Sequence, residues 1–88
     1  MNMYDKGKLK VLIKSILINN SPKEMTSKQL ADIINAHDWG FNTYITSPKI
    51  ASLMNYELNK SGKHFMENIV TIKKKGINRY CIQSTNER

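Results

Sequence analysis

The sequence predicts a small α+β domain in which three helices precede a C-terminal β hairpin. Apolar residues recur at helical spacing in three segments between residues 9 and 60. Two runs typical of β strands follow, at residues 68–72 and 79–83. The 88 residues are enough for one hydrophobic core, so we expect a single domain over residues 1–88. The core spans about residues 9–83, and the polar ends, 1–8 and 84–88, are expected to be flexible.

The first helix is predicted from its apolar periodicity. Five side chains follow the i, i+3, i+4, i+7, i+8 spacing of a helix with one buried face: Leu9, Leu12, Ile13, Ile16 and Leu17. The segment from Asn19 to Pro22 ends this helix, because proline has no backbone N–H to continue the hydrogen-bond ladder.

The second helix has a clear start signal. Thr26 is followed three residues later by Gln29, which is the spacing of a capping box. Met25 before the cap and Leu30 after it are spaced to form a hydrophobic staple. The buried face then continues to about Ala36. Residues 23–25, just before the cap, could add a short strand to the hairpin.

A connection of ten residues, 37–46, separates the second helix from the third. Gly40 and Asn42 mark turns within it. Four residues make it too apolar for a plain solvent loop, and we expect several of them to pack over the core: Trp39, Phe41, Tyr44 and Ile45. Ser47 is then predicted to cap the third helix, with Pro48 at its first helical position.

The third helix is predicted over residues 49–60 and has two unlike faces. Apolar residues form the buried face: Ile50, Leu53, Met54 and Leu58. The other face is polar and carries no acidic residue: Lys49, Ser52, Asn55, Tyr56, Asn59 and Lys63.

The hairpin strands are predicted at residues 68–72 and 79–83, joined by residues 73–78. Alternation directs one set of side chains to the core: Ile69 or Val70, Ile72, Tyr80 and Ile82. The outward set is Thr71, Lys73 and Arg79.

The charge balance favours an anionic partner. Fourteen Lys and Arg residues against seven Asp and Glu give a formal net charge of +7, which suits nucleic acid or a membrane surface. Twelve of these cations are lysines, a bias that AT-rich coding alone produces, so their position carries more weight. Between residues 60 and 79, Glu67 is the only acid, and the cations are Lys60, Lys63, Lys73, Lys74, Lys75 and Arg79.

This order of elements resembles a winged helix-turn-helix domain over about residues 9–83. Residues 25–31 (MTSKQLA) and 47–54 (SPKIASLM) look like the starts of that family's second and recognition helices, and residues 73–80 (KKKGINRY) look like its wing. The resemblance implies three helices with a C-terminal β wing of two or three strands. The connection between the second and third helices departs from the family, because it has about ten residues instead of three or four.

The resemblance also implies a sequence-specific double-stranded DNA-binding protein, such as a small transcriptional regulator of a phage or another mobile element. On the recognition helix, base edges or nearby phosphates would meet Lys49, Ser52, Asn55, Tyr56 and Asn59. On the wing, phosphate or the minor groove would meet Lys73, Lys74, Lys75 and Arg79. Neighbouring candidates are Lys28, Lys60, Lys63 and Asn78.

Two other functions fit the same residues. A replication accessory protein that binds single-stranded DNA would stack bases on Tyr56, Trp39 or Phe41. A protein-interaction module or inhibitor would bring the cationic face to an acidic protein surface. Formation of a homodimer would add buried surface to a small core.

Other classes find little support in the sequence. His37 and His64 lack neighbouring Cys or clustered acids, so we expect no metal site, and the scattered acids indicate no catalysis and no cofactor. Cys81 alone excludes an intrachain disulfide and indicates a small core residue in a reducing compartment. The most apolar stretch, residues 11–18, is too short to span a bilayer, so a cytoplasmic protein without a membrane partner is expected.

Overall fold

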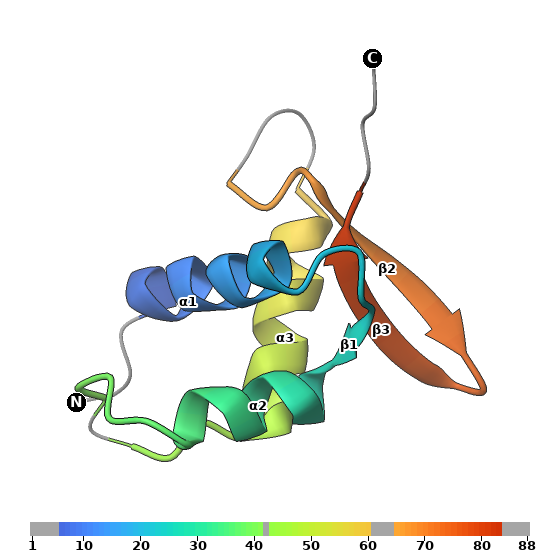
Figure 1. Cartoon of the computed structure of the whole chain (residues 1–88). Coiled ribbons are helices and arrows are strands. Elements are labelled where there is room, and N and C mark those ends of the chain that lie inside the picture. Colours follow the sequence, from blue (N-terminus) through green and yellow to red (C-terminus); the bar gives the residue numbers. More distant parts are fainter. Residues whose placement is uncertain (1–5, 42, 61–64, 84–88) are drawn as a thin grey trace.

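The computed structural model describes residues 6–41, 43–60 and 65–83, and it has the predicted α+β class (Figure 1). The strands form one antiparallel sheet in the order β1-β3-β2, which gives a winged-helix-like architecture. The elements of the described residues are α1 (Lys6–Asn19), β1 (Met25–Thr26), α2 (Ser27–Asn35), α3 (Ser47–Leu58), β2 (Ile69–Lys74) and β3 (Ile77–Ile82).

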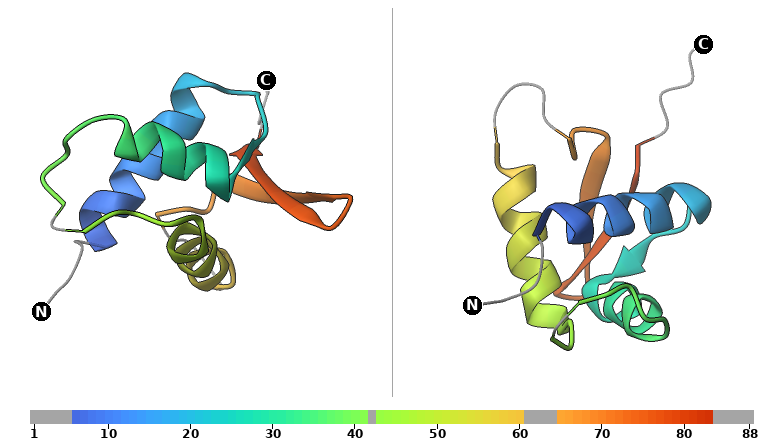
Figure 2. Two further views of the ribbon diagram at one scale, coloured as in Figure 1. Left: turned by 90° about the horizontal axis from the view of Figure 1, so that it is seen from below. Right: turned by 90° about the vertical axis from the view of Figure 1, so that its left-hand side faces the viewer.

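The helices pack so that one side of α3 stays uncovered. In Figures 1 and 2, α1 and α2 lie across the same side of α3, and no described segment covers its opposite side. The β2–β3 hairpin projects away from the helices beside α3. Apolar side chains from all of these elements fill the core, including Leu9, Ile13, Leu30, Ile34, Ile50, Met54, Ile69 and Tyr80.

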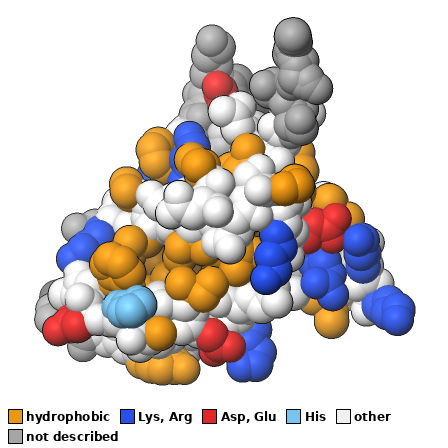
Figure 3. Space-filling view, viewed as in Figure 1, with side chains coloured by type: hydrophobic (Ala, Val, Ile, Leu, Met, Phe, Trp, Pro, Cys, Tyr) orange, Lys and Arg blue, Asp and Glu red, His pale blue; other side chains and the backbone are white. Residues whose placement is uncertain are grey.

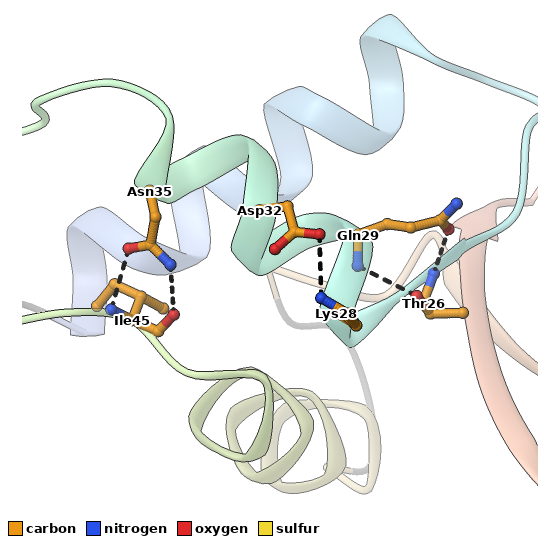
Figure 4. Close-up of polar contacts among 6 residues, drawn as sticks. All are labelled: Thr26, Lys28, Gln29, Asp32, Asn35 and Ile45. Carbon is orange, nitrogen blue, oxygen red and sulfur yellow. Dashed lines mark hydrogen bonds and ion pairs between the residues drawn. The ribbon is translucent and has the colours of Figure 1, made fainter.

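The residues around Thr26 confirm the predicted capping box, and the short strand that residues 23–25 left open is present at Met25–Thr26. The Thr26 hydroxyl accepts a hydrogen bond from the Gln29 backbone N–H at 3.1 Å, and the Gln29 side chain accepts one from the Thr26 backbone N–H at 2.9 Å (Figure 4). Met25, immediately before the cap, is buried and pairs with Tyr80 of β3. Because β1 runs directly into α2, this pairing ties the hairpin to the helices.

The predicted cap of α3 was wrong by one residue. Thr46 is the cap, and its hydroxyl accepts a hydrogen bond from the backbone N–H of Lys49 at 3.3 Å. Ser47 is therefore the first helical residue and Pro48 the second. Proline fits there because the first backbone N–H groups of a helix have no intrahelical acceptor.

Two helix boundaries also differ from the prediction. α1 begins at Lys6, so residues 6–8 belong to the helix and not to a flexible end. α3 ends at Leu58, which is half-buried against the core and not fully buried as predicted. Residues 1–5 and 84–88 lie outside the described part of the chain.

The strand register corrects the predicted orientation of the hairpin side chains. Thr71 pairs with Tyr80, and Ile72 pairs with Arg79. Residues paired across antiparallel strands point to the same face. Because Tyr80 is buried toward the helices, Thr71 shares the core-facing side and Ile72 lies on the opposite side. The predicted sides of Ile72, Thr71 and Lys73 are therefore wrong, although Lys73 is exposed. Only the choice between Ile69 and Val70 was open in the sequence, and Ile69 is the buried one.

The long connection between α2 and α3 is held by one side chain of α2. The Asn35 amide nitrogen donates to the Ile45 carbonyl at 2.6 Å, and the Ile45 backbone N–H donates to the Asn35 amide oxygen at 3.1 Å (Figure 4). The Ile45 side chain is fully buried. The end of the connection is thereby fixed to α2 just before the Thr46 cap, so its length does not free α3 from α2.

We expect Asn35→Ala to lower the free energy of unfolding by about 2–3 kcal/mol, because both partly buried backbone groups of Ile45 lose their partner. Asn35→Asp keeps an acceptor for the Ile45 N–H but has no donor for its carbonyl, so its loss should be smaller than that of Asn35→Ala. Urea unfolding followed by circular dichroism measures both variants. Equal stability of wild type and Asn35→Ala would contradict this role.

Candidate nucleic-acid interface

The uncovered side of α3 brings together most of the predicted recognition residues. A surface hollow of about 470 Å³ is lined by Ser52, Asn55, Tyr56, Asn59 and Lys60. All five side chains are exposed, and 67% of the surface of Tyr56 is accessible. Together they offer hydroxyl, amide and ammonium donors, amide oxygen acceptors and one aromatic ring. Helical spacing predicted four of these residues, which lie opposite the buried stripe of α3: Ser52, Asn55, Tyr56 and Asn59. Lys60 was predicted only as a neighbouring candidate, and Lys49 does not line the hollow.

Contacts within this face hold several of its polar groups in place. The Asn59 amide nitrogen donates to the Asn55 amide oxygen at 3.3 Å. Among the described residues, the Asn55 amide nitrogen and the Asn59 amide oxygen form no other hydrogen bond, so they offer a partner one donor group and one acceptor. The Lys60 ammonium lies 5.1 Å from the centre of the Tyr56 ring. Lys49, at the start of α3, is half-buried and its ammonium donates to the Tyr44 carbonyl at 3.4 Å.

Glu57 is a buried acid on α3 that the sequence analysis missed. Only 4% of its surface is accessible, and its carboxylate pairs with Lys60 at 3.3 Å and with Lys10 of α1 at 3.6 Å. The spacing from Ile50 and Leu53 would have placed it on the buried stripe, but Leu58 was assigned there instead. Because two ammonium groups surround this carboxylate, the exposed face of α3 carries no uncompensated acid.

The tip of the hairpin is tighter than predicted. The six-residue connection expected at 73–78 is wrong, since the strands extend to Lys74 and from Ile77 and leave only Lys75 and Gly76 in the turn. Both turn residues have positive φ, 53° and 78°, as a type I′ turn requires, and this turn matches the twist of the paired strands. A lysine in this left-handed conformation costs about 1 kcal/mol, so Lys75 occupies the tip at some expense to stability.

The lysines of the hairpin differ in whether an acid neutralises them. Lys74 pairs with Glu24, just before β1, at 2.8 Å. Lys73 and Lys75 are exposed, and among the described residues neither forms an ion pair with an acid. Figure 3 shows Lys and Arg side chains gathered over the projecting end of the hairpin, with an acidic group beside them. The free positive charge of the tip therefore comes from Lys73 and Lys75.

The remaining predicted site residues contribute less directly. Lys28 lies on α2 and forms an exposed ion pair with Asp32 at 3.4 Å (Figure 4). Arg79 of β3 is half-buried, and its Nε has no hydrogen-bond partner among the described residues. The Asn78 side chain forms a hydrogen bond with the Tyr80 hydroxyl. Burial raises the pKa of Tyr80, and the hydrogen bond with Asn78 lowers it in part. Lys63 lies outside the described residues.

The aromatic residues of the connection mostly support the core. Trp39 and Phe41 are half-buried against it, and the Trp39 ring meets His37 edge-on at 5.8 Å between ring centres. Ile45 is buried, so three of the four apolar residues pack on the core as expected, while Tyr44 has 65% of its surface accessible. Tyr56 therefore remains the predicted stacking residue that is openly exposed.

The described part of the chain has no cluster of metal-ligating side chains. Over residues 6–41, 43–60 and 65–83, no three His, Cys, Asp or Glu side chains are grouped as a metal ion would need. Cys81 is buried in β3, as predicted, while His64 is not described. Within the same ranges no helix is both long and apolar enough to cross a bilayer.

Comparison with known proteins assigns no family: no protein-family model, no curated protein and no solved structure matches the chain. The class is accordingly defined by architecture alone, as a small α+β domain with three helices and a C-terminal antiparallel hairpin.

Proposed function

We propose that the protein is a sequence-specific double-stranded DNA-binding protein of the winged helix-turn-helix type, acting as a small transcriptional regulator. One observation carries the proposal. The uncovered side of α3 bears polar side chains without an uncompensated acid, and it lies beside a hairpin whose tip carries Lys73 and Lys75 without acidic partners among the described residues. In this arrangement α3 enters the major groove and the hairpin contacts phosphates next to it.

The chemistry of the α3 face suits the edges of base pairs. The major groove is wide enough for a helix and presents both donors and acceptors. Asn59 and Asn55 together offer an acceptor and a donor group, which matches the N6 donor and N7 acceptor of adenine. Ser52 is less selective, because its hydroxyl both donates and accepts.

The two hydrogen bonds between the Asn35 side chain and the Ile45 backbone support docking of α3 as a rigid element. A recognition helix must keep its angle to the body while its side chains meet base edges and the hairpin meets phosphate. The two hydrogen bonds from Asn35 to Ile45 and the pairing of Met25 with Tyr80 join α3 and the hairpin to the same body. Both contact surfaces therefore reach a partner in one fixed geometry.

Binding to single-stranded DNA is the main alternative, and the exposed Tyr56 ring favours it. Aromatic rings on a cationic surface stack on unpaired bases. The first test therefore measures fluorescence anisotropy with a labelled mixed-sequence duplex and with the corresponding single strand, at about 50 and about 200 mM salt. We expect the duplex to compete better and its affinity to fall steeply with salt.

The other outcomes of this experiment are equally informative. Stronger binding to the single strand would replace the duplex proposal by the single-strand one. Affinity that does not change with salt would remove the phosphate contacts on which both depend. If neither probe binds, a partner with an acidic protein surface becomes the better explanation of the cationic tip.

The hairpin lysines that form no ion pair should contribute most to the salt dependence of DNA binding. The double variant Lys73→Ala/Lys75→Asn removes both unpaired charges, and Asn suits the turn, because it tolerates positive φ. Its slope of log K against log salt should be lower by about 1.8 units, or about 0.9 for each phosphate contact. The loss should be the same for all duplex sequences, since phosphates carry no sequence information.

The matched control removes an ion pair of the same hairpin. Glu24→Gln/Lys74→Gln changes no net charge and abolishes the contact at 2.8 Å. Its salt slope should equal that of wild type. A slope that falls as much as in the Lys73/Lys75 variant would show that any lysine near the tip contributes alike, which contradicts the role of the unpaired lysines.

Asn59→Ala should relax base preference without an equal loss of non-specific affinity. Selection from a random duplex pool would give the site preferred by wild type. The variant should then lose about 1–3 kcal/mol of discrimination at one or two positions of that site. Asn19→Ala, at the exposed end of α1, is the control and should leave the preference unchanged. Identical site preferences of wild type and Asn59→Ala would remove Asn59 from base recognition.

A further inference from the structure

A second hollow adjoins the face of α3, on the side nearest the start of α1. It measures about 210 Å³ and is lined by Lys6, Ser52, Leu53, Tyr56 and Glu57. Ser52 and Tyr56 also line the larger hollow, so the two hollows adjoin at these residues. Lys6 extends this surface from α3 onto α1. Lys6 is not among the predicted site residues, because residues 1–8 were expected to form a flexible end.

The lining of the second hollow suits a phosphate group. The Lys6 ammonium, the Ser52 hydroxyl and the Tyr56 hydroxyl are all hydrogen-bond donors of the kinds that bind backbone phosphates. Glu57 is the acid in the lining, and its carboxylate already pairs with Lys10 and Lys60. Because Glu57 is already paired with these two lysines, the Lys6 ammonium is the charge that the lining offers to an anion.

The position of this hollow relative to the hairpin gives it a specific role. In Figures 1 and 2, α3 lies between the start of α1 and the hairpin. A helix in the major groove is bordered by two phosphate backbones, one on each side. A cation on the hairpin side and a cation on the α1 side therefore face different strands.

We propose that the hollow between α1 and α3 binds a backbone phosphate of duplex DNA, on the strand across the major groove from the one that the hairpin contacts. Lys6 supplies the charge, and the Ser52 and Tyr56 hydroxyls complete the donor set. This inference rests on the proposed function, and it extends the interface to an element that the resemblance did not include. The hairpin lysines and Lys6 then hold α3 in the groove from both sides.

Lys6→Ala tests the inference with little risk to the fold, because the residue is exposed at the first position of α1 and alanine favours helices. The control is Lys23→Ala, which removes the same charge from an exposed position in the loop 20–24. That loop and α3 lie on opposite sides of the molecule in both views of Figure 2. Lys6→Ala should lower the salt slope by about 0.9, while Lys23→Ala should leave it close to wild type.

Single methylphosphonate substitutions then identify the strand. Each duplex carries one uncharged phosphate analogue at a known position of the selected site, and binding of wild type, Lys6→Ala and Lys73→Ala is compared. Wild type should lose affinity at one or more positions on each strand. Lys6→Ala should become insensitive to substitution at one position of one strand, and Lys73→Ala at one position of the other strand.

Failure of this inference is distinguishable from failure of the proposed function. If Lys6→Ala behaves like Lys23→Ala while Lys73→Ala still weakens duplex binding, the phosphate site at α1 is wrong and the hairpin contacts stand. The site at α1 is also wrong if Lys6→Ala and Lys73→Ala become insensitive on the same strand. If wild type does not bind duplex DNA in a salt-dependent manner, both the proposed function and the phosphate site at α1 are wrong.

Discussion

Two hydrogen bonds between the Asn35 side chain and the Ile45 backbone set the position of α3. The connection 37–46 is long for two adjacent helices, and a free segment of that length would let α3 take many angles. Asn35 satisfies both backbone groups of Ile45 as a neighbouring strand would, and the buried Ile45 side chain anchors the same point in the core. The Thr46 cap follows at once, so α3 begins from a fixed position.

The hairpin is joined to the body by a second local constraint. Met25 pairs with Tyr80 on β3, and the next residue, Thr26, caps α2 with a reciprocal hydrogen bond to Gln29. Sheet pairing and helix capping thus meet at adjacent residues, and the angle between hairpin and helices follows from them. The Lys74–Glu24 ion pair spans the same junction, while the charges of Lys73 and Lys75 project beyond it.

Much of the fold could be predicted from the sequence, because apolar periodicity and capping are local signals. The capping box at Thr26 and most of the exposed polar set on α3 follow from spacing of a few residues. The short strand at Met25–Thr26 was only a possibility in the sequence, because its pairing with β3 depends on distant residues. The pairing of Glu57 with Lys10 and the partner of Asn35 could not be predicted, since both depend on which helices pack together. The hairpin lysines looked equivalent in sequence, and only the strand register and Glu24 separate Lys74 from its neighbours.

The central claim is that the uncovered side of α3, the hairpin tip and the start of α1 form one DNA-binding surface. An NMR titration of the ¹⁵N-labelled protein with a duplex tests it most directly, because each backbone amide reports its own surroundings. The account predicts that the largest shift changes occur at residues 52–60, at Lys73 to Gly76 and near Lys6, while the loop 20–24 is little affected. Shift changes concentrated on that loop and on the outward side of α1, with α3 and the hairpin tip unchanged, would contradict it.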